Sequence, residues 1–110
     1  VIDWQITCRG RATFDVAYFT CTSLDVGLRR RHGLDLLRLY HRTLQEHGVR
    51  DYSFEQCLQE FRVGAFFCLV YAVIAGGSLD WANERGAALA MAMVERTVTA
   101  IAELEAADAI

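Results

Sequence analysis

A chain of 110 residues is long enough for one compact domain with a single core, and we treat residues 1–110 as one unit. Its 54% hydrophobic content is too high for a disordered segment, and a net charge of −3 without a basic stripe argues against a nucleic-acid partner. The four cysteines have no CxxC spacing, so they indicate neither a zinc site nor a redox pair and favour a reducing cytoplasm.

The first five residues, VIDWQ, are typical of a short β-strand. A strand needs a neighbour for its backbone donors and acceptors, and no later segment alternates apolar and polar residues over a comparable length. We therefore expect this strand to pair with residues that precede Val1, which would make the chain a C-terminal fragment of a longer protein.

Two helices are predicted next. Apolar residues at helical spacing indicate a short first helix from Thr13 to about Leu24, with Asp15 in its first turn. Asp25 can cap a second helix that continues to about His47 and ends at Gly48. The inward face of this second helix is expected to carry Leu34, Leu37, Tyr40 or His41, and Leu44, with Leu36 and Leu39 widening the apolar side.

A capping-box pattern, Ser53-Phe-Glu-Gln56, opens a third helix over residues 54–75, which Gly76-Gly77 is expected to end. The second half of this helix is apolar all round, so we expect it to be central. Its apolar run over residues 63–75 is short of the ~18 residues that cross a bilayer, and no membrane span is predicted. The aromatic residues expected in the core are Phe61, Phe66, Phe67 and Tyr71.

A fourth helix is predicted to begin between residues 80 and 87 and to continue to about Ala106, followed by a frayed end over residues 106–110. The fold class that follows is mainly α, with four to five helices preceded by one orphan β-strand. The inward face of the fourth helix is expected to carry Ala90, Met93, Val94, Thr97, Ile101 and Leu104.

Two motifs carry a family resemblance. Val1-Ile-Asp-Trp-Gln5 and, after a loop, Phe14-Asp-Val-Ala17 resemble the "IDW" strand and the "xDLA" helix start of the aminoglycoside phosphotransferase and choline-kinase-like family. Within this protein-kinase-like family, the chain looks most like the ecdysteroid-kinase-like bacterial phosphotransferases, which have counterparts of Thr22-Ser-Leu-Asp25, Leu37-Arg-Leu-Tyr-His41 and Tyr52-Ser-Phe-Glu-Gln56. The resemblance implies the C-terminal helical part of a protein-kinase-like fold. It also implies an ATP-dependent enzyme that phosphorylates a hydroxyl of a small-molecule alcohol acceptor.

The resemblance assigns roles to two aspartates. Asp3 matches the family aspartate that holds Mg²⁺ against the ATP phosphates, a role that suits a carboxylate because Mg²⁺ prefers oxygen ligands. Asp15 matches a structural brace at the start of its helix. The general base, the loop over the phosphates and the strand lysine would all lie before Val1, and the chain contains no lysine. The 110 residues alone are therefore expected to be inactive.

Two weaker candidates for binding the acceptor are Asp25 and Trp81. The carboxylate of Asp25, like those of Asp51 and Glu55, could face a cationic acceptor, although helix capping explains them equally well. Trp81 could line a cleft beside the Gly76-Gly77 pair, although a tryptophan that covers the end of a helix bundle is the simpler interpretation. The identity of the acceptor does not follow from these residues.

A second hypothesis is a free-standing α-helical binding or dimerisation module without catalysis. The strand over residues 1–5 argues against it, because an isolated bundle has no use for an unpaired strand. In either case, an unpaired strand and exposed apolar surface lead us to expect self-association.

Overall fold

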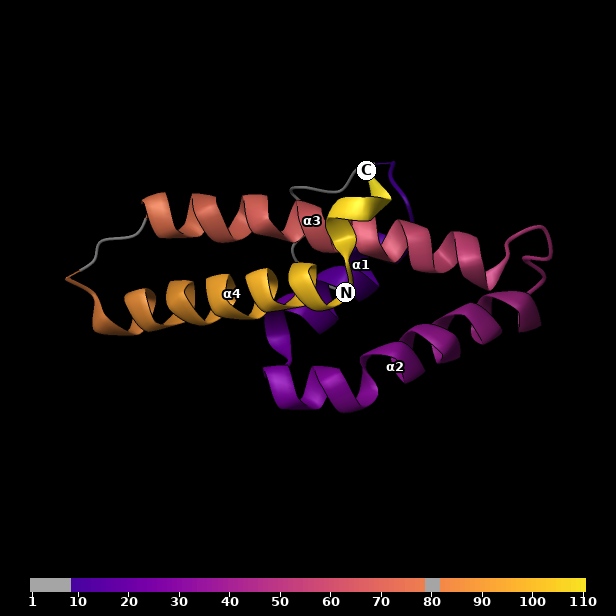
Figure 1. Ribbon diagram of the computed structural model, residues 1–110, viewed down its shortest axis with the longest axis horizontal. Helices are drawn as coiled ribbons and strands as arrows, with labels where there is room; N and C mark the ends of the chain where they lie inside the picture. Colours follow the sequence, from indigo (N-terminus) through magenta and orange to yellow (C-terminus); the bar gives the residue numbers. More distant parts are fainter. Residues whose placement is uncertain (1–8, 79–81) are drawn as a thin grey trace.

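The computed structural model describes residues 9–78 and 82–110. This part of the chain is mainly helical, as predicted (Figure 1). The expected strand over residues 1–5 lies outside the described residues. The elements are α1 (Thr13–Tyr18), the π-helical turn η2 (Phe19–Ser23), α2 (Val26–Glu46), α3 (Phe54–Ser78), α4 (Glu84–Glu103) and the 3₁₀ turn η3 (Ala106–Ala109).

The predicted limits of α2 are confirmed by its capping interactions. The Asp25 Oδ1 accepts a hydrogen bond from the Leu28 backbone N–H at 2.9 Å. At the other end, Gly48 has a φ of +97°, a left-handed conformation that favours glycine. The Val49 N–H donates to the Leu44 carbonyl at 3.0 Å, which satisfies one of the last carbonyls of the helix.

The start of α3 is also as predicted, but its end is not. The Gln56 N–H donates to Ser53 Oγ at 3.1 Å, and the Ser53 N–H donates to Gln56 Oε1 at 2.9 Å, so the capping box is complete. The helix then continues through Gly76 and Gly77 to Ser78. The prediction that the two glycines end it was wrong: both lie within the helix, where a glycine costs only ~1 kcal/mol.

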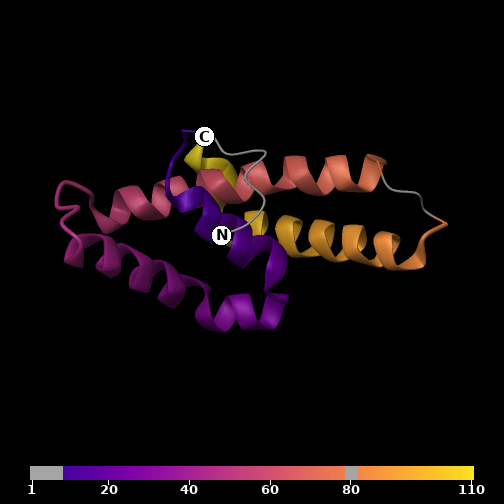
Figure 2. The ribbon, with the colours of Figure 1, turned by 180° about the vertical axis from the view of Figure 1, so that it is seen from behind.

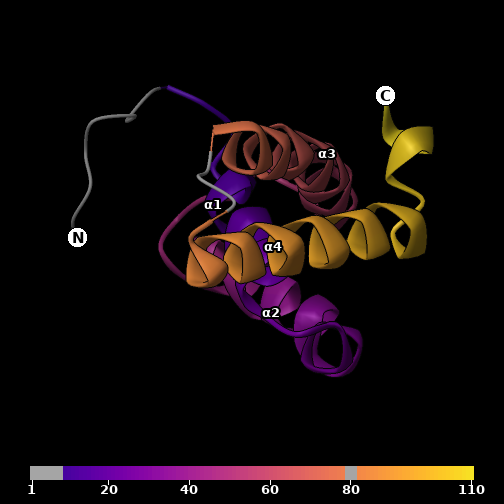
Figure 3. The same ribbon diagram turned by 90° about the vertical axis from the view of Figure 1, so that its left-hand side faces the viewer.

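The helices are arranged around an α3–α4 hairpin (Figure 1). Helix α1 and the η2 turn cross α3 near its middle and reach α4 (Figure 2). Seen along the hairpin, α2 and α3 lie on opposite sides of α4, and η3 lies beside α3 at the edge of the molecule (Figure 3). The crossing of α1 and α3 is close, since a Cβ added at Gly64 would lie 2.9 Å from the Ala17 Cβ.

One core joins the first three helices to the C-terminal part of α4. On α2, the buried residues follow a four-residue spacing, from Arg29 and Gly33 to Leu37 and His41. Leu34, placed on the inward face from the sequence, is instead 43% exposed. The buried core cluster consists of Ala17, Cys21, Leu37, Cys57, Phe61, Ala65, Cys68 and Ala100.

The expectation that the second half of α3 is central was wrong. Of the four aromatic residues predicted to lie in the core, only Phe61 is buried, and Phe67 is 58% exposed. Phe66 and Tyr71 are half-buried. In this half of the helix only one face meets other helices, so the remaining apolar residues point outward.

The C-terminal part of the chain is more ordered than the predicted frayed end. Ala106 in η3 is buried, and the Gln59 side-chain amide donates to the Ala109 carbonyl at 2.9 Å. On α4, Ala90 and Thr97 are buried as predicted. The last turns of the chain therefore cover the outer side of α3 near its N-terminal end.

Two polar clamps fasten the N-terminal helices to α4. The Glu103 carboxylate accepts from the buried Arg29 at 2.7 Å and from Arg30 Nε at 2.8 Å. Arg96 Nη1 donates to the Thr22 and Ser23 carbonyls at 3.0 and 3.1 Å. These bonds hold the end of η2 and the start of α2 against the C-terminal half of α4.

Among the described helices, α3 alone has the length and apolar composition to cross a membrane. The apolar run counted in the sequence was shorter, because it stopped before the glycine pair. Core helices of soluble proteins meet the same two criteria, and four of the eight residues in the core cluster belong to α3.

Candidate functional site

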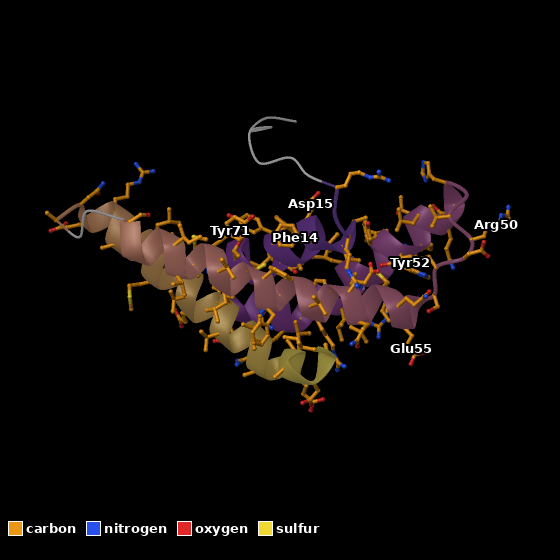
Figure 4. The ribbon with its side chains drawn as sticks, turned by 90° about the horizontal axis from the view of Figure 1, so that it is seen from above. Phe14, Asp15, Arg50, Tyr52, Glu55 and Tyr71 are labelled. Carbon is orange, nitrogen blue, oxygen red and sulfur yellow. The ribbon has the colours of Figure 1, made fainter. Side chains whose placement is uncertain are left out.

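Asp15 lies on the outer side of α1. This helix buries Thr13 and Ala17 against its neighbours, and a residue between them points the opposite way because helical positions two apart differ by about 200°. Figure 4 shows Asp15 on the side of α1 away from α3, beside Phe14. Its carboxylate makes no hydrogen bond or ion pair within residues 9–78 and 82–110.

Beside Asp15, an open groove of about 330 Å³ lies between the α1–η2 segment and α2. Its walls are almost entirely apolar, so the Asp15 carboxylate and the Tyr40 hydroxyl are its main polar features. Burial raises the pKa of Tyr40, and the nearby carboxylates of Asp15 and Glu60 add to this shift. The groove is lined by Asp15, Val16, Phe19, Thr20, Leu36, Leu39 and Tyr40.

The floor of this groove includes a turn of π-helix. In η2 the Thr20 hydroxyl donates to the Val16 carbonyl at 2.8 Å, and the Thr22 hydroxyl donates to the Tyr18 carbonyl at 2.6 Å. These side chains satisfy backbone acceptors where the helical register widens. Single π-helical turns occur frequently at functional sites, so this turn supports the groove beside Asp15 as a candidate ligand-binding site.

Next to the groove, three aromatic rings join α1 to α3. Tyr18 and Tyr71 meet edge to face with ring centroids 5.6 Å apart, and Phe14 lies 6.1 Å from Tyr71. In Figure 4 Phe14 lies toward Tyr71 while Asp15 points away. This contact, with the close packing of Ala17 on Gly64, fixes the rotation of α1 and therefore the direction of the Asp15 carboxylate.

A second groove, polar and about 380 Å³ in volume, lies beside Glu60. The Glu60 carboxylate accepts hydrogen bonds from Tyr52 Oη at 2.7 Å, Arg11 Nη1 at 3.3 Å and Thr13 Oγ1 at 3.4 Å. Burial and the bond to Glu60 raise the pKa of the Tyr52 hydroxyl, which keeps it a donor. Since Glu60 is already engaged by three donors, this groove is better explained as a structural junction.

The described histidines and cysteines do not form a metal site. No group of three His, Cys, Asp or Glu residues among the described residues is placed to hold a metal ion. His41 is buried, its Nε2 lies 2.8 Å from the Tyr52 carbonyl, and it packs on the Phe54 ring. Burial raises the pKa values of Cys21, Cys57 and Cys68, that of Cys68 to about 12, which is typical of inert core thiols.

The candidate residues from the sequence are therefore separated. Asp3 and Trp81 lie outside the described residues. Asp15 lies at the groove, where it is available to a ligand or to a partner beyond the described residues. Asp25 caps α2 and does not line that groove, so the structural interpretation of Asp25 is the one that its geometry favours.

Sequence reasoning missed several residues that position this site. Glu60 and Glu103 were not singled out, because nothing in their local pattern indicates partners 47 to 74 positions away. Gly64 was one glycine within an apolar run. A glycine in a helix that is otherwise rich in large residues does signal a close approach of another backbone, and that signal could have located the α1–α3 crossing.

This mainly helical arrangement, with a short first helix that presents an aspartate, is consistent with the helical C-terminal part of a kinase-like enzyme. The DUF1679 family model, whose description reads "Uncharacterized oxidoreductase dhs-27", matches residues 1–104. The chain belongs to this family, one of ecdysteroid-kinase-like proteins in the protein-kinase-like superfamily. No curated protein and no solved structure matches the chain.

Proposed function

We propose that the chain is the C-terminal segment of an ATP-dependent phosphotransferase that phosphorylates a hydroxyl of a small molecule. The observation that carries the proposal is the family match over residues 1–104, within a superfamily of kinase-like proteins. The local structure of Phe14-Asp-Val-Ala17 supports it: these residues lie in a helix, with Ala17 buried and Asp15 exposed.

In this proposal, Asp3 contributes one ligand to Mg²⁺, which would neutralise charge on the phosphates of bound ATP. The described residues include no group of three His, Cys, Asp or Glu that could hold the ion. The remaining ligands and the general base would come from outside residues 9–78 and 82–110, and the 110 residues alone are expected to be inactive. Asp15 would brace the start of α1 against that part of the enzyme.

The groove between α1–η2 and α2 is the part of the chain best suited to contribute to an acceptor pocket. Its apolar walls fit the carbon skeleton of an acceptor, and the Tyr40 hydroxyl could bind a hydroxyl or amino group of that acceptor. Its open shape means that other residues of the enzyme would have to complete it.

The word "oxidoreductase" in the family description suggests a different reaction. A dinucleotide-binding enzyme of the usual kind would show a G-x-G-x-x-G turn between a strand and a helix. The eight glycines of this chain include no G-x-G pair, and the described residues contain no strand. The kinase-like alternative is favoured by what the chain does contain, the two family motifs Val1-Ile-Asp-Trp-Gln5 and Phe14-Asp-Val-Ala17.

The test is to express the full reading frame that encodes this chain, as wild type, Asp3→Ala and Asp25→Ala. Phosphoryl transfer from Mg²⁺-ATP would be measured against a panel of small alcohols. Asp3→Ala should lower the turnover number at least about a hundredfold while thermal unfolding stays unchanged. Asp25→Ala, which removes only a helix cap, should lower stability by ~1 kcal/mol and leave turnover near wild type. Equal activity of Asp3→Ala and wild type would refute the role of Asp3.

A further inference from the structure

The outer face of α3 carries a row of apolar side chains with no described neighbour on it. Phe67, Val70, Val73 and Ile74 are each between 50% and 62% exposed. They lie on the face of α3 opposite to the buried Cys68 and Ala72. No charged residue occurs between Arg62 and Asp80, so the row has no charge along its length.

The spacing of the row is that of a surface which packs on another helix. Within the row, Phe67, Val70 and Ile74 follow one another at intervals of three and four residues, the spacing of the a and d positions of a coiled coil. Near the N-terminal end of α3, the chain's own η3 turn covers this side through Gln59 and Ala109. This side of α3 is therefore covered near Gln59 and exposed from Phe67 onward.

We propose that this open row is a homodimer interface, in which the α3 helices of two copies of the chain pack antiparallel about a two-fold axis near Val70. An uncharged apolar row is complementary to itself, which a two-fold contact requires. The antiparallel direction follows from η3, because a parallel pair would bring the two η3 turns together at one end. The antiparallel pair places them at opposite ends.

The size of the row sets the strength of this contact. Its four most exposed side chains form a patch on the order of 400 Å² per copy, about half of what one partner contributes to a standard interface. A contact of this size is expected to give a weak dimer. A bilayer fits the row less well, since the acidic chain has no basic residue between Arg62 and Arg85 to meet anionic head groups.

The first test is sedimentation equilibrium of the chain up to about 100 µM, as wild type, Val70→Glu and Val98→Glu. Val70 and Val98 are 50% and 49% exposed on α3 and α4, so the two variants make the same change at equal exposure. Val70→Glu would place two carboxylates together at the axis and should raise the dissociation constant at least about tenfold. Val98→Glu should leave it unchanged.

Cross-linking tests the direction of the helices, in a Cys8→Ser background because the other three cysteines are buried. Val70→Cys should form an intermolecular disulfide on mild oxidation, and an equal mixture of Phe67→Cys and Ile74→Cys chains should form mainly the mixed dimer. A monomer at all concentrations, or a dimer that Val70→Glu leaves intact, would overturn the proposal. A monomer that binds phosphatidylcholine vesicles through Val70 would also overturn it and would identify a bilayer as the occupant.

This inference does not depend on the phosphotransferase proposal. Val70 lies outside the groove beside Asp15, and the two tests use different variants and different measurements. Loss of dimerisation with retained phosphoryl transfer, or the reverse, would separate them.

Discussion

The two ends of the α3–α4 hairpin are held together by different interactions. At the end that carries η3, side chains far apart in sequence meet in specific polar contacts, such as Arg29 with Glu103 and Tyr52 with Glu60. Toward the opposite end, small residues such as Ala72 and Ala90 bring the two helices together. The polar contacts described there, from Ser78 Oγ to the Ile74 carbonyl and from the Gly86 N–H to Asn83, are local.

This contrast suggests that one end of the hairpin stabilises the fold while the other end offers a surface for contacts with other molecules. Directional polar bonds specify one arrangement of the helices, and truncating either partner of a buried bond leaves the other unsatisfied. Packing of small side chains only sets the helix separation and leaves the outer face free. We therefore expect the end with η3 to dominate the free energy of unfolding, and the opposite end of the hairpin to dominate contacts with other molecules.

The largest expected effect compares two phenylalanines of α3, one in each region. Phe61 is 1% exposed, and Phe61→Ala should lower the free energy of unfolding by ~4 kcal/mol because it leaves a cavity in the core. Phe67→Ala should change it by less than ~0.5 kcal/mol at protein concentrations where the chain is monomeric. Urea unfolding followed by circular dichroism measures both. A large loss for Phe67→Ala in the monomer would contradict the division between the two regions.

The next effect probes the clamp at Glu103 and its pH dependence. The hydrogen bond from Arg30, and further bonds and charge from Arg29, lower the pKa of the Glu103 carboxyl. A carboxyl with a lowered pKa in the folded state stabilises the protein above its unfolded pKa, and this contribution is lost as the pH falls through the folded value. Glu103→Gln should therefore lower stability by about 2 kcal/mol at pH 7, with a smaller difference from wild type below about pH 4.

The control for this clamp is Asp35→Asn. Asp35 pairs with Arg38 at 2.9 Å, but both side chains are more than half exposed, and such surface pairs contribute little. Urea unfolding of both variants from pH 7 to pH 3 gives the comparison. A Glu103→Gln curve parallel to wild type over this range would exclude Glu103 as the source of the pH dependence.

A smaller effect compares two glycines of α3. A Cβ at Gly64 would lie 2.9 Å from the Ala17 Cβ, so Gly64→Ala should push α1 away and lower stability by roughly 1.5 kcal/mol. At Gly76 nothing lies within 4 Å, and Gly76→Ala should instead raise stability by up to ~1 kcal/mol because alanine favours a helix. Thermal unfolding measures the opposite signs. A gain at Gly64 would show that the crossing is looser than described.

The predictions made from the sequence differ in success according to whether they depend on neighbouring or on distant residues. Most local signals were reliable: the Asp25 cap, the Ser53–Gln56 capping box and the stop at Gly48 all occur as predicted, because each depends on residues within a few positions. The exception is the Gly76-Gly77 pair, which does not end α3. The burial of α3 was not predictable from its own composition. A helix that is apolar all round is expected to be central, yet which of its faces are covered depends on the paths of the other helices.

The candidate site was predictable only in part. The exposure of Asp15 follows from the burial of Thr13 and Ala17 on either side of it, which the helical spacing could indicate. The groove beside it depends on the π-helical turn and on the placement of α2, and no local sequence signal for either was recognised. The hydrogen-bond partners of Glu60 could not be predicted either, because they belong to other parts of the chain.

The smallest predicted effect concerns that Glu60 junction. Tyr52→Phe removes the 2.7 Å hydrogen bond to Glu60 while keeping the ring that packs on His41, and should lower stability by about 1 kcal/mol. Tyr40→Phe is the matched control, because the Tyr40 hydroxyl makes no hydrogen bond within the described part of the chain, and it should change stability by less than ~0.5 kcal/mol. Since Glu60 keeps Arg11 and Thr13 as donors, the loss at Tyr52 should remain near one hydrogen bond. A loss above ~2 kcal/mol in urea unfolding would mean that Tyr52 organises the whole junction, and that the start of α1, with Asp15, depends on it.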